Sequence, residues 1–310
     1  MLSRRNVRVK VMQQLYSLAQ DRELTNDQAV QAFLKTIHDS FRLYLLNLYC
    51  IVRVCYFAGE DFKHRQSKHI KSDDDKTFTD KIYSNPLIQS IEKNKFIQNK
   101  FKEEHCSEGL DDDLFRKIYK DFCKEKSYLE YLNKEADHGD HVEILLELYR
   151  FCRRNELFNE IMDDRFACWT DDKSLVIGAL KKTLKALPNN EPFYKEYIPD
   201  DDTVLNFGKY LLDNTCKLDE DLSAMITPVL ENWDSERVAL VDMILIKMGV
   251  VEMVHFKTIP PKVTLNEYVE LSKTYSTDKS KEFVNGVLDK LLKQLESNGK
   301  IVKEGRGLSI

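Results

Sequence analysis

The sequence predicts an all-α fold, both from its composition and from the spacing of its apolar residues. Glycine and proline are scarce, at 10 and 7 of 310 residues, while leucine, lysine, glutamate and aspartate dominate. This balance favours helices with polar outer faces over a turn-rich β architecture. Because 42% of the residues are hydrophobic, the chain can bury one large core or two modest ones without disulfides or a structural metal.

The first predicted helix covers residues 4–20. Its apolar residues recur at helical spacing behind the candidate N-cap Ser3; they are Val7, Val11, Leu15 and Leu18. The only charges before Asp21 are basic, and they belong to Arg4, Arg5, Arg8 and Lys10. Cations in the first turns oppose the helix dipole by about 0.3–1 kcal/mol each. The cluster fits two interpretations: a patch whose arginines bind phosphates and stack on unpaired bases, or a solvated helix end. Charge alone does not decide between them.

The stretch from about Phe33 to Pro199 is a series of apolar helical segments separated by hydrophilic breaks. We expect these breaks to be loops: Asp61–Asp80, Asn99–Asp113, Asn133–His141 and Pro188–Pro199. No internal repeat of about 20 to 50 residues is convincing, which argues against a solenoid. The acidic run Asp200, Asp201 and Asp202 then precedes an apolar helical pattern, so it is predicted to cap that helix and complement its dipole.

The last third predicts three helices with short connections, which would form a compact bundle. The first begins at Asp234 or Ser235 and ends before Pro260. Thr264-Leu265-Asn266-Glu267 has the pattern of a capping box, and it predicts the start of the second helix, which runs to about Tyr275.

The third of these helices is predicted to begin at Thr277 or Asp278. Its broad apolar stripe consists of Phe283, Val284, Val287, Leu288, Leu291, Leu292 and Leu295. Asn285-Gly286 would ordinarily signal a turn, yet it lies within this stripe, where glycine costs about 1 kcal/mol relative to alanine. The expected reason for Gly286 is the close approach of a neighbouring backbone or of a ligand.

Common catalytic patterns are missing from the sequence. No aspartate run is followed by the further aspartate of the D-D-x-x-D motif that holds magnesium and diphosphate in helical isoprenoid synthases. His138-Gly139-Asp140-His141 would set two imidazoles three residues apart for a metal if it were helical, but Gly139 favours a solvated loop. Glycine-rich phosphate loops, dinucleotide fingerprints and nucleophile elbows do not occur. We therefore predict a protein that is not an enzyme and that uses no metal and no cofactor.

Cysteine usage and hydropathy predict a cytoplasmic protein. Seven cysteines, without a C-x-x-C pair, suit reduced buried thiols. The N-terminus lacks the apolar core of a signal peptide, and the most apolar stretch, Leu43 to Ala58, contains Asn47 and Arg53 and is too short for a bilayer. The formal net charge of −5 would repel a phosphate backbone, so nucleic-acid binding requires a local basic patch.

Four segments resemble the NusB family of transcription antitermination factors. Arg4-Arg5-x-x-Arg8 followed by Gln13-x-Leu15-Tyr16 is similar to the opening helix of that family. The segments 232–242, 264–273 and 283–290 are similar to its second half, in the same order and spacing. The similarity covers about residues 1–20 and 203–297, and the stretch between them has no counterpart in the short family form.

The resemblance implies two packed helical bundles. The N-terminal subdomain would cover residues 1–230, enlarged by a helical insertion at about 33–199, and the C-terminal bundle would cover 231–310. It also implies the family's activity, which is binding the boxA element of nascent RNA jointly with the ribosomal small-subunit protein NusE, so that RNA polymerase resists termination on ribosomal RNA operons. The expected partners are therefore boxA RNA, NusE and the polymerase antitermination complex, without a membrane.

The family's site residues carry over position by position. The implied RNA contacts are Arg4, Arg5, Arg8, Lys247, Lys279 and Phe283, and the implied NusE contacts are Tyr16 and Asp242. The hypothesis is that the arginines neutralise phosphates while unpaired bases lie against Phe283 and the backbone of Asn285-Gly286. Ordinary structural interpretations stay open, with Tyr16 and Phe283 as core residues and Asp242 as a solvated helix acid.

Three departures from the family bear on its RNA specificity. The family often has arginine where this chain has Met243 and Lys247, and tyrosine where it has Val251. Lysine keeps the charge but loses the bidentate fork, so RNA affinity or sequence preference would differ. Two other classes stay open. One is an RNA-modifying enzyme, since similar domains precede some ribosomal RNA methyltransferases, although no glycine-rich nucleotide-binding unit follows before Ile310. The other is a helical protein-interaction scaffold.

Overall fold

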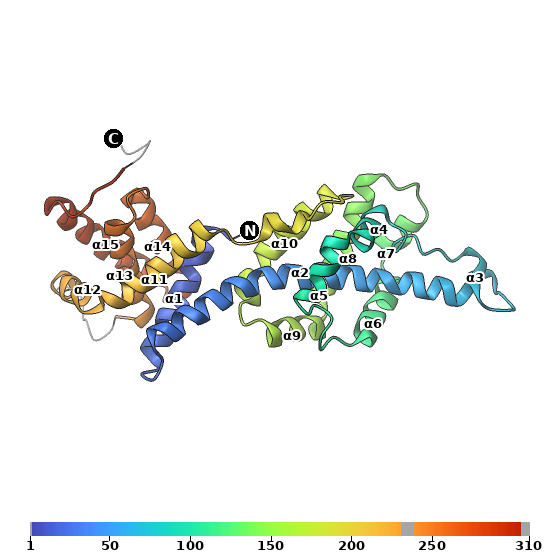
Figure 1. Ribbon diagram of the computed structural model, residues 1–310, viewed down its shortest axis with the longest axis horizontal. Coiled ribbons are helices and arrows are strands. Elements are labelled where there is room, and N and C mark those ends of the chain that lie inside the picture. The colour runs from blue at the N-terminus through green and yellow to red at the C-terminus, as the bar shows by residue number, and fades with distance from the viewer. Residues whose placement is uncertain (1, 231–237, 305–310) are drawn as a thin grey trace. The chain divides into compact units, whose positions relative to one another are not determined.

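The computed structural model describes residues 2–230 and 238–304, and it confirms the all-α prediction. Every regular element within these two ranges is a helix (Figure 1). The chain divides into two compact units. We call His38–Ile198 the insertion unit, and we call Leu2–Ile37 with the described residues from Pro199 onward the terminal unit. The predicted domain bounds, with an insertion at about 33–199 and a boundary near residue 230, stay predictions.

The insertion unit is built around the second half of α2 (Asn26–Gln66), where most side chains from Phe41 to Ala58 are buried. Its other helices are α3 (Asp73–Thr77), α4 (Pro86–Lys93), α5 (Lys95–Glu103), α6 (Asp112–Phe122), α7 (Lys126–Leu132), α8 (His138–Arg154), α9 (Glu156–Arg165), α10 (Trp169–Ala186) and the 3-10 helix η1 (Phe193–Tyr197). α8 packs against α4, α6, α7, α9 and α10. Buried Asn47 donates to the carbonyl of Leu43 and accepts from the Tyr149 hydroxyl at 2.9 Å, which satisfies its amide.

The apolar part of α2 belongs to a protein core. Its most apolar 18-residue window has a mean hydropathy of 1.3, which by length and composition alone would suit a membrane span. However, 78% of that window is buried inside the structure. A helix that is apolar all round is expected wherever neighbours cover every face, so α2 has the character of a core helix.

The terminal unit consists of α1 (Arg4–Gln20), the first turns of α2, the π-helix η2 (Asp202–Lys209), α11 (Tyr210–Lys217), α12 (Asp219–Ile226), the 3-10 helix η3 (Thr227–Leu230), α13 (Leu240–His255), α14 (Pro261–Tyr275) and α15 (Ser280–Ser297). α13, α14 and α15 pack on one another, and α1 packs on η2, α11 and α13. A Cβ at Gly208 would lie 2.5 Å from both Phe33 Cζ and Val7 Cγ1. Glycine at this position therefore allows α1, α2 and η2 to approach closely.

Several predicted helix boundaries are confirmed. α1 covers residues 4–20, and Ser3 caps it in a reciprocal capping box with Asn6. The carboxylate of Asp200 accepts a 2.8 Å hydrogen bond from the backbone N–H of Thr203, so the acidic run does cap a helix. α14 ends at Tyr275, and the predicted apolar stripe of α15 is buried. The predicted start at Asp234 or Ser235 lies outside the described residues.

The predicted loops are only partly loops. α2 continues to Gln66, α3 and η1 occupy parts of two breaks, and α8 begins at His138. Asp137 caps α8 in a capping box with Asp140, so the two histidines lie in the first helical turn, and the loop expectation for them was wrong. His141 Nδ1 hydrogen-bonds to the Tyr131 hydroxyl at 2.8 Å. Among the described residues, no three His, Cys, Asp or Glu side chains gather as a metal site.

Two further predictions in the last third were wrong. α14 begins at Pro261, so Thr264 lies inside the helix with its side chain buried, and the segment 264–267 is not a capping box. Proline fits the first helical position because its missing N–H needs no partner there. At Gly286, no atom of the described structure would lie within 4 Å of an added Cβ. A close approach by a neighbouring helix is therefore not the reason for this glycine.

Candidate nucleic-acid interface

The first turn of α1 presents two exposed arginines. Arg4 lies 3.6 Å from the carboxylate of Asp202 and above the ring of Phe207. Arg5 donates two hydrogen bonds to the carboxylate of Glu267, at 2.9 and 3.0 Å. This hydrogen bonding raises the pKa of Arg5. About half of each arginine side chain remains exposed, at 44% and 52%, so both can also contact a ligand.

Arg8 is buried, which corrects its predicted role as an RNA contact. It is 3% exposed and donates two hydrogen bonds to the carboxylate of Glu252, at 2.8 and 2.7 Å. Burial opposes the charge, but the hydrogen bonds and charge of Glu252 outweigh burial and raise the pKa of Arg8. Glu252 also accepts from the hydroxyls of Thr264 at 2.8 Å and Tyr268 at 3.0 Å. Arg8 therefore holds α1 against α13 and α14. Lys10, the fourth cation of the cluster, is also buried.

A hollow of about 340 Å³ opens beside the exposed arginines. Its lining combines guanidinium groups and one carboxylate with apolar surface; the residues are Ser3, Arg4, Arg5, Arg8, Thr258, Ile259, Pro260, Val263 and Glu267. Val263 is 46% exposed. Guanidinium groups beside exposed apolar surface suit a single-stranded nucleic acid, whose phosphates and base faces are both accessible.

Two predicted RNA contacts on α15 differ in accessibility. Lys279, at the N-cap position, is exposed, and no ion pair to it occurs among the described side chains. Phe283 is only 7% exposed and belongs to the buried stripe of α15. The prediction of an RNA-facing aromatic is therefore corrected, because the ring is committed to the core.

Lys247 and Asp242 are also less accessible than their predicted roles as RNA and NusE contacts require. Lys247 is largely buried, and its Nζ donates to Asp219 at 2.6 Å, so it does not join the arginines at the hollow. Asp242 is 4% exposed and accepts a 2.7 Å hydrogen bond from the hydroxyl of Ser280. It therefore links α13 to α15 and is neither a solvated acid nor an accessible partner contact. Tyr16, in contrast, is 42% exposed and is not a core residue.

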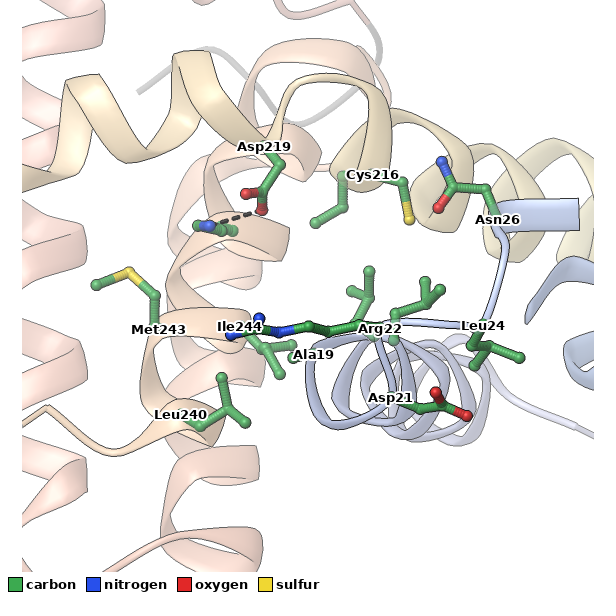
Figure 2. A pocket seen from close by; sticks show the side chains of 14 residues that line it. Ala19, Asp21, Arg22, Leu24, Asn26, Cys216, Asp219, Leu240, Met243 and Ile244 are labelled. Carbon is green, nitrogen blue, oxygen red and sulfur yellow. Dashed lines mark hydrogen bonds and ion pairs between the residues drawn. The ribbon is translucent and has the colours of Figure 1, made fainter. Parts of the chain in front are cut away.

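A second groove, of about 360 Å³, lies between the end of α1, α11, α12 and the start of α13. Figure 2 shows the side chain of Arg22 extended toward Ile244, with Met243 and Leu240 on one side and Cys216 and Asn26 on the other. Lys247 and Leu15 line it as well. Burial raises the pKa of Cys216 to about 11, so its thiol stays protonated at neutral pH. The lining of the groove mixes apolar side chains with charged and polar ones, a mixture that suits a protein segment.

Sequence reasoning missed the acids that organise this site. Glu252 and Glu267 lie 244 and 262 residues from the arginines they bind. One signal pointed to them: three cations in the first turns of α1 oppose the helix dipole, so the fold had to supply acidic partners. Glu267 was instead assigned to a local capping box, because a single sequence shows local patterns and not distant contacts.

Comparisons with known proteins agree on one family. The model of the NusB family matches residues 172–293. The transcription antitermination protein NusB of Salinibacter ruber is 37% identical over 111 residues, which is 36% of this chain and 69% of that protein. The protein of the same name from Chloroherpeton thalassium is 42% identical over 89 residues, 29% and 42% of the two chains. That of Enterococcus faecalis is 37% identical over 106 residues, 33% and 69%. No solved structure matches significantly.

Proposed function

The chain belongs to the NusB family, and we propose that it binds boxA-type single-stranded RNA through Arg4 and Arg5 together with the ribosomal protein NusE. In this role it supports processive transcription of ribosomal RNA operons as part of the polymerase antitermination complex in the cytoplasm. The activity is binding without catalysis. The observation that carries the proposal is the pair of half-exposed arginines at the hollow beside α14.

The different roles that we propose for the three arginines follow from the exposure of their side chains. Arg8 is sealed by Glu252 and fixes α1, whereas Arg4 and Arg5 are accessible. Because Glu267 already neutralises part of Arg5, a phosphate must compete with a carboxylate for its guanidinium. We therefore infer modest RNA affinity for the protein alone, and a requirement for NusE to reach tight binding.

The groove of Figure 2 is the surface that we propose for NusE. The exposed Tyr16 follows Leu15 on α1, and Met243 supplies flexible apolar surface at the groove. This assignment replaces Asp242, which is buried, by its neighbour Met243.

The test is fluorescence anisotropy of a labelled boxA RNA at two salt concentrations, with and without NusE. We expect Arg4→Ala with Arg5→Ala to weaken binding about tenfold or more and to flatten its salt dependence, because two phosphates are no longer neutralised. Arg154→Ala, at an exposed arginine of the insertion unit, is the matched control and should bind like the wild type. Met243→Glu should abolish the tightening by NusE while leaving RNA binding alone unchanged. An absence of RNA binding under all conditions would refute the proposal and favour a protein scaffold.

A further inference from the structure

We propose that the insertion unit carries a second site for single-stranded RNA, formed by exposed lysines of α4, α5 and α10 and by one exposed aromatic ring. We call this surface the lysine face, and its residues are Lys93, Lys95, Phe96, Lys181, Lys182 and Lys185. The inference rests on the proposed function only in taking RNA as the ligand. It uses none of the residues of the arginine hollow.

Hydrogen bonds hold the two halves of the lysine face together. The side-chain amide of Asn94, at the junction of α4 and α5, donates to the backbone carbonyls of Asn189 and Glu191, both at 3.0 Å. The lysines on either side of Asn94 therefore lie beside the segment that follows α10. Lys185 is in the last turn of α10, only four residues before Asn189. Lys181 and Lys182 lie one turn earlier on the exposed side of the same helix.

The five lysines are exposed and unneutralised. No ion pair to any of them occurs among the residues that the structure describes, whereas their neighbour Lys100 is paired with Glu103 and Glu104. The helix dipole accounts for Lys185, at the C-terminal end of α10, but Lys95 is the first residue of α5, where the dipole disfavours a cation. The acids nearest in sequence are Glu92, which is half-buried, Asp172, which is buried, and Glu191. The local charge is therefore positive in a chain whose net charge is −5.

Phe96 adds a second kind of contact. Its side chain is 53% exposed and stands one residue after Lys95, although most other phenylalanines of the insertion unit are buried. An exposed ring bordered by cations matches a single strand, in which each phosphate is followed by a base with an open face. A duplex offers phosphates but no open base face, and an acidic peptide would use the lysines without the ring.

Two RNA sites on one chain would strengthen each other. Once a strand is held at one site, binding at the other becomes intramolecular, and the effective concentration can reach the millimolar range. A longer transcript should therefore bind more tightly than a strand that reaches only the arginine hollow.

The test uses the full chain and a labelled oligouridylate of about 20 nucleotides, a length of strand that exceeds one small binding site. We expect Lys182→Glu with Lys185→Glu to weaken binding at least tenfold, and to reduce the salt slope by about 0.7 for each phosphate that is no longer neutralised. Phe96→Ala should weaken binding as well. The matched control is Lys117→Glu with Lys120→Glu on α6, because these lysines are equally spaced, exposed and without an ion pair in the described structure. Circular dichroism melts should show all variants folded.

The outcomes separate this inference from the proposed function. Arg4→Ala with Arg5→Ala should weaken binding of a short boxA strand and leave the dependence of oligouridylate binding on the lysine face intact. If the wild type, the lysine variant and the α6 control bind oligouridylate equally, the proposed lysine face is wrong. This conclusion does not depend on the result with boxA RNA. Sensitivity to the lysines but not to Phe96, together with equal binding of polyglutamate, would overturn it in favour of an acidic protein partner.

Discussion

The role inferred for Arg8 from the sequence differs from the role that its contacts in the structure give it. By charge it belongs to a basic cluster, but by position it is one partner of a buried ion pair with Glu252. Two charges taken out of water are stable only when each has its full set of hydrogen bonds. Glu252 has four, from Arg8, Thr264 and Tyr268, and the arginine also lies over the rings of Phe207 and Tyr268.

Removing Arg8 should therefore damage the fold before it damages RNA binding. Arg8→Ala leaves the Glu252 carboxylate buried without its counter-ion, and we expect the free energy of unfolding to fall by about 3–5 kcal/mol. Urea denaturation measures the decrease. The pair Arg8→Met with Glu252→Gln removes both charges, keeps an oxygen that can accept from Thr264 and Tyr268, and should be clearly less destabilised. If the single and double variants are destabilised by the same amount, packing and not the unpaired charge explains the effect.

Alanine substitutions at two glycines inside helices should have opposite effects on stability. Gly208→Ala places a Cβ within 2.5 Å of Phe33 and Val7, so it should destabilise the terminal unit by about 1–3 kcal/mol. Gly286→Ala meets no described atom within 4 Å, so it should stabilise α15 by up to about 1 kcal/mol. Thermal unfolding of both variants tests this. If Gly286→Ala is more stable yet binds RNA more weakly, then a ligand, rather than a helix, is what approaches this glycine.

At the scale of elements, the first turn of α8 links three parts of the insertion unit. His141 accepts or donates a hydrogen bond with Tyr131 of α7, and Asn85, the N-cap of α4, donates to the backbone carbonyl of His141. Lys81 in turn donates to the carbonyl of Tyr131 at the end of α7. The ends of α4, α7 and α8 are thus tied together by side chains rather than by apolar contact alone.

This junction should be sensitive to pH. Burial, and then the charge of Lys81, lowers the pKa of His141 below its usual value near 6.5. The folded state therefore binds the proton less readily than the unfolded state, so the contribution to stability is complete above pH 6.5 and is lost as the pH falls below it. We expect the melting temperature to decrease from about pH 7.5 to about pH 5.5 less steeply in His141→Gln than in the wild type. Parallel curves of melting temperature against pH for the two proteins would rule out His141 as the cause. His255 is present in both proteins, so its titration does not contribute to the difference between the curves.

At the scale of the whole molecule, the two units have separate cores although α2 contributes to both. One buried hydrophobic cluster is confined to residues between Phe41 and Tyr197, all within the insertion unit. The terminal unit is held by α1 against the α13 to α15 bundle and by the Arg8–Glu252 pair. Separate cores allow the family's bundle to retain its function while carrying an insertion of about its own size.

A destabilising core substitution in one unit should therefore leave the stability of the other unit unchanged. Leu148 on α8 is fully buried, and Leu148→Ala should cost about 2–5 kcal/mol in the insertion unit. Hydrogen exchange followed by mass spectrometry should show faster exchange in α4 to α10 and unchanged exchange in α13 to α15. Faster exchange in both units would show that α2 couples them into one cooperative structure.

The sequence by itself determined what depends on neighbours along the chain. Residues 4–20 and the stripe of α15 follow the helical period, and Ser3 and Asp200 cap through hydrogen bonds that span three residues. Three of the four family blocks, 4–16, 264–273 and 283–290, could also be recognised in the sequence, because each lies within one helix. Short polar helices such as α3 were missed, since they contain too few apolar residues to show a period.

Only the tertiary structure decided which cations of α1 are exposed and which are buried. Arg5 and Arg8 look alike in sequence, but the acid that neutralises Arg8 lies 244 residues away, and its burial depends on how α1 packs against α13 and α14. In the same way, only packing shows that Phe283 and Asp242 are buried and that Asn94, between two lysines, binds the segment that follows α10. The physical reason is that exposure and charge pairing are set by contacts distant in sequence, whereas helix period and capping are set by contacts within a few residues.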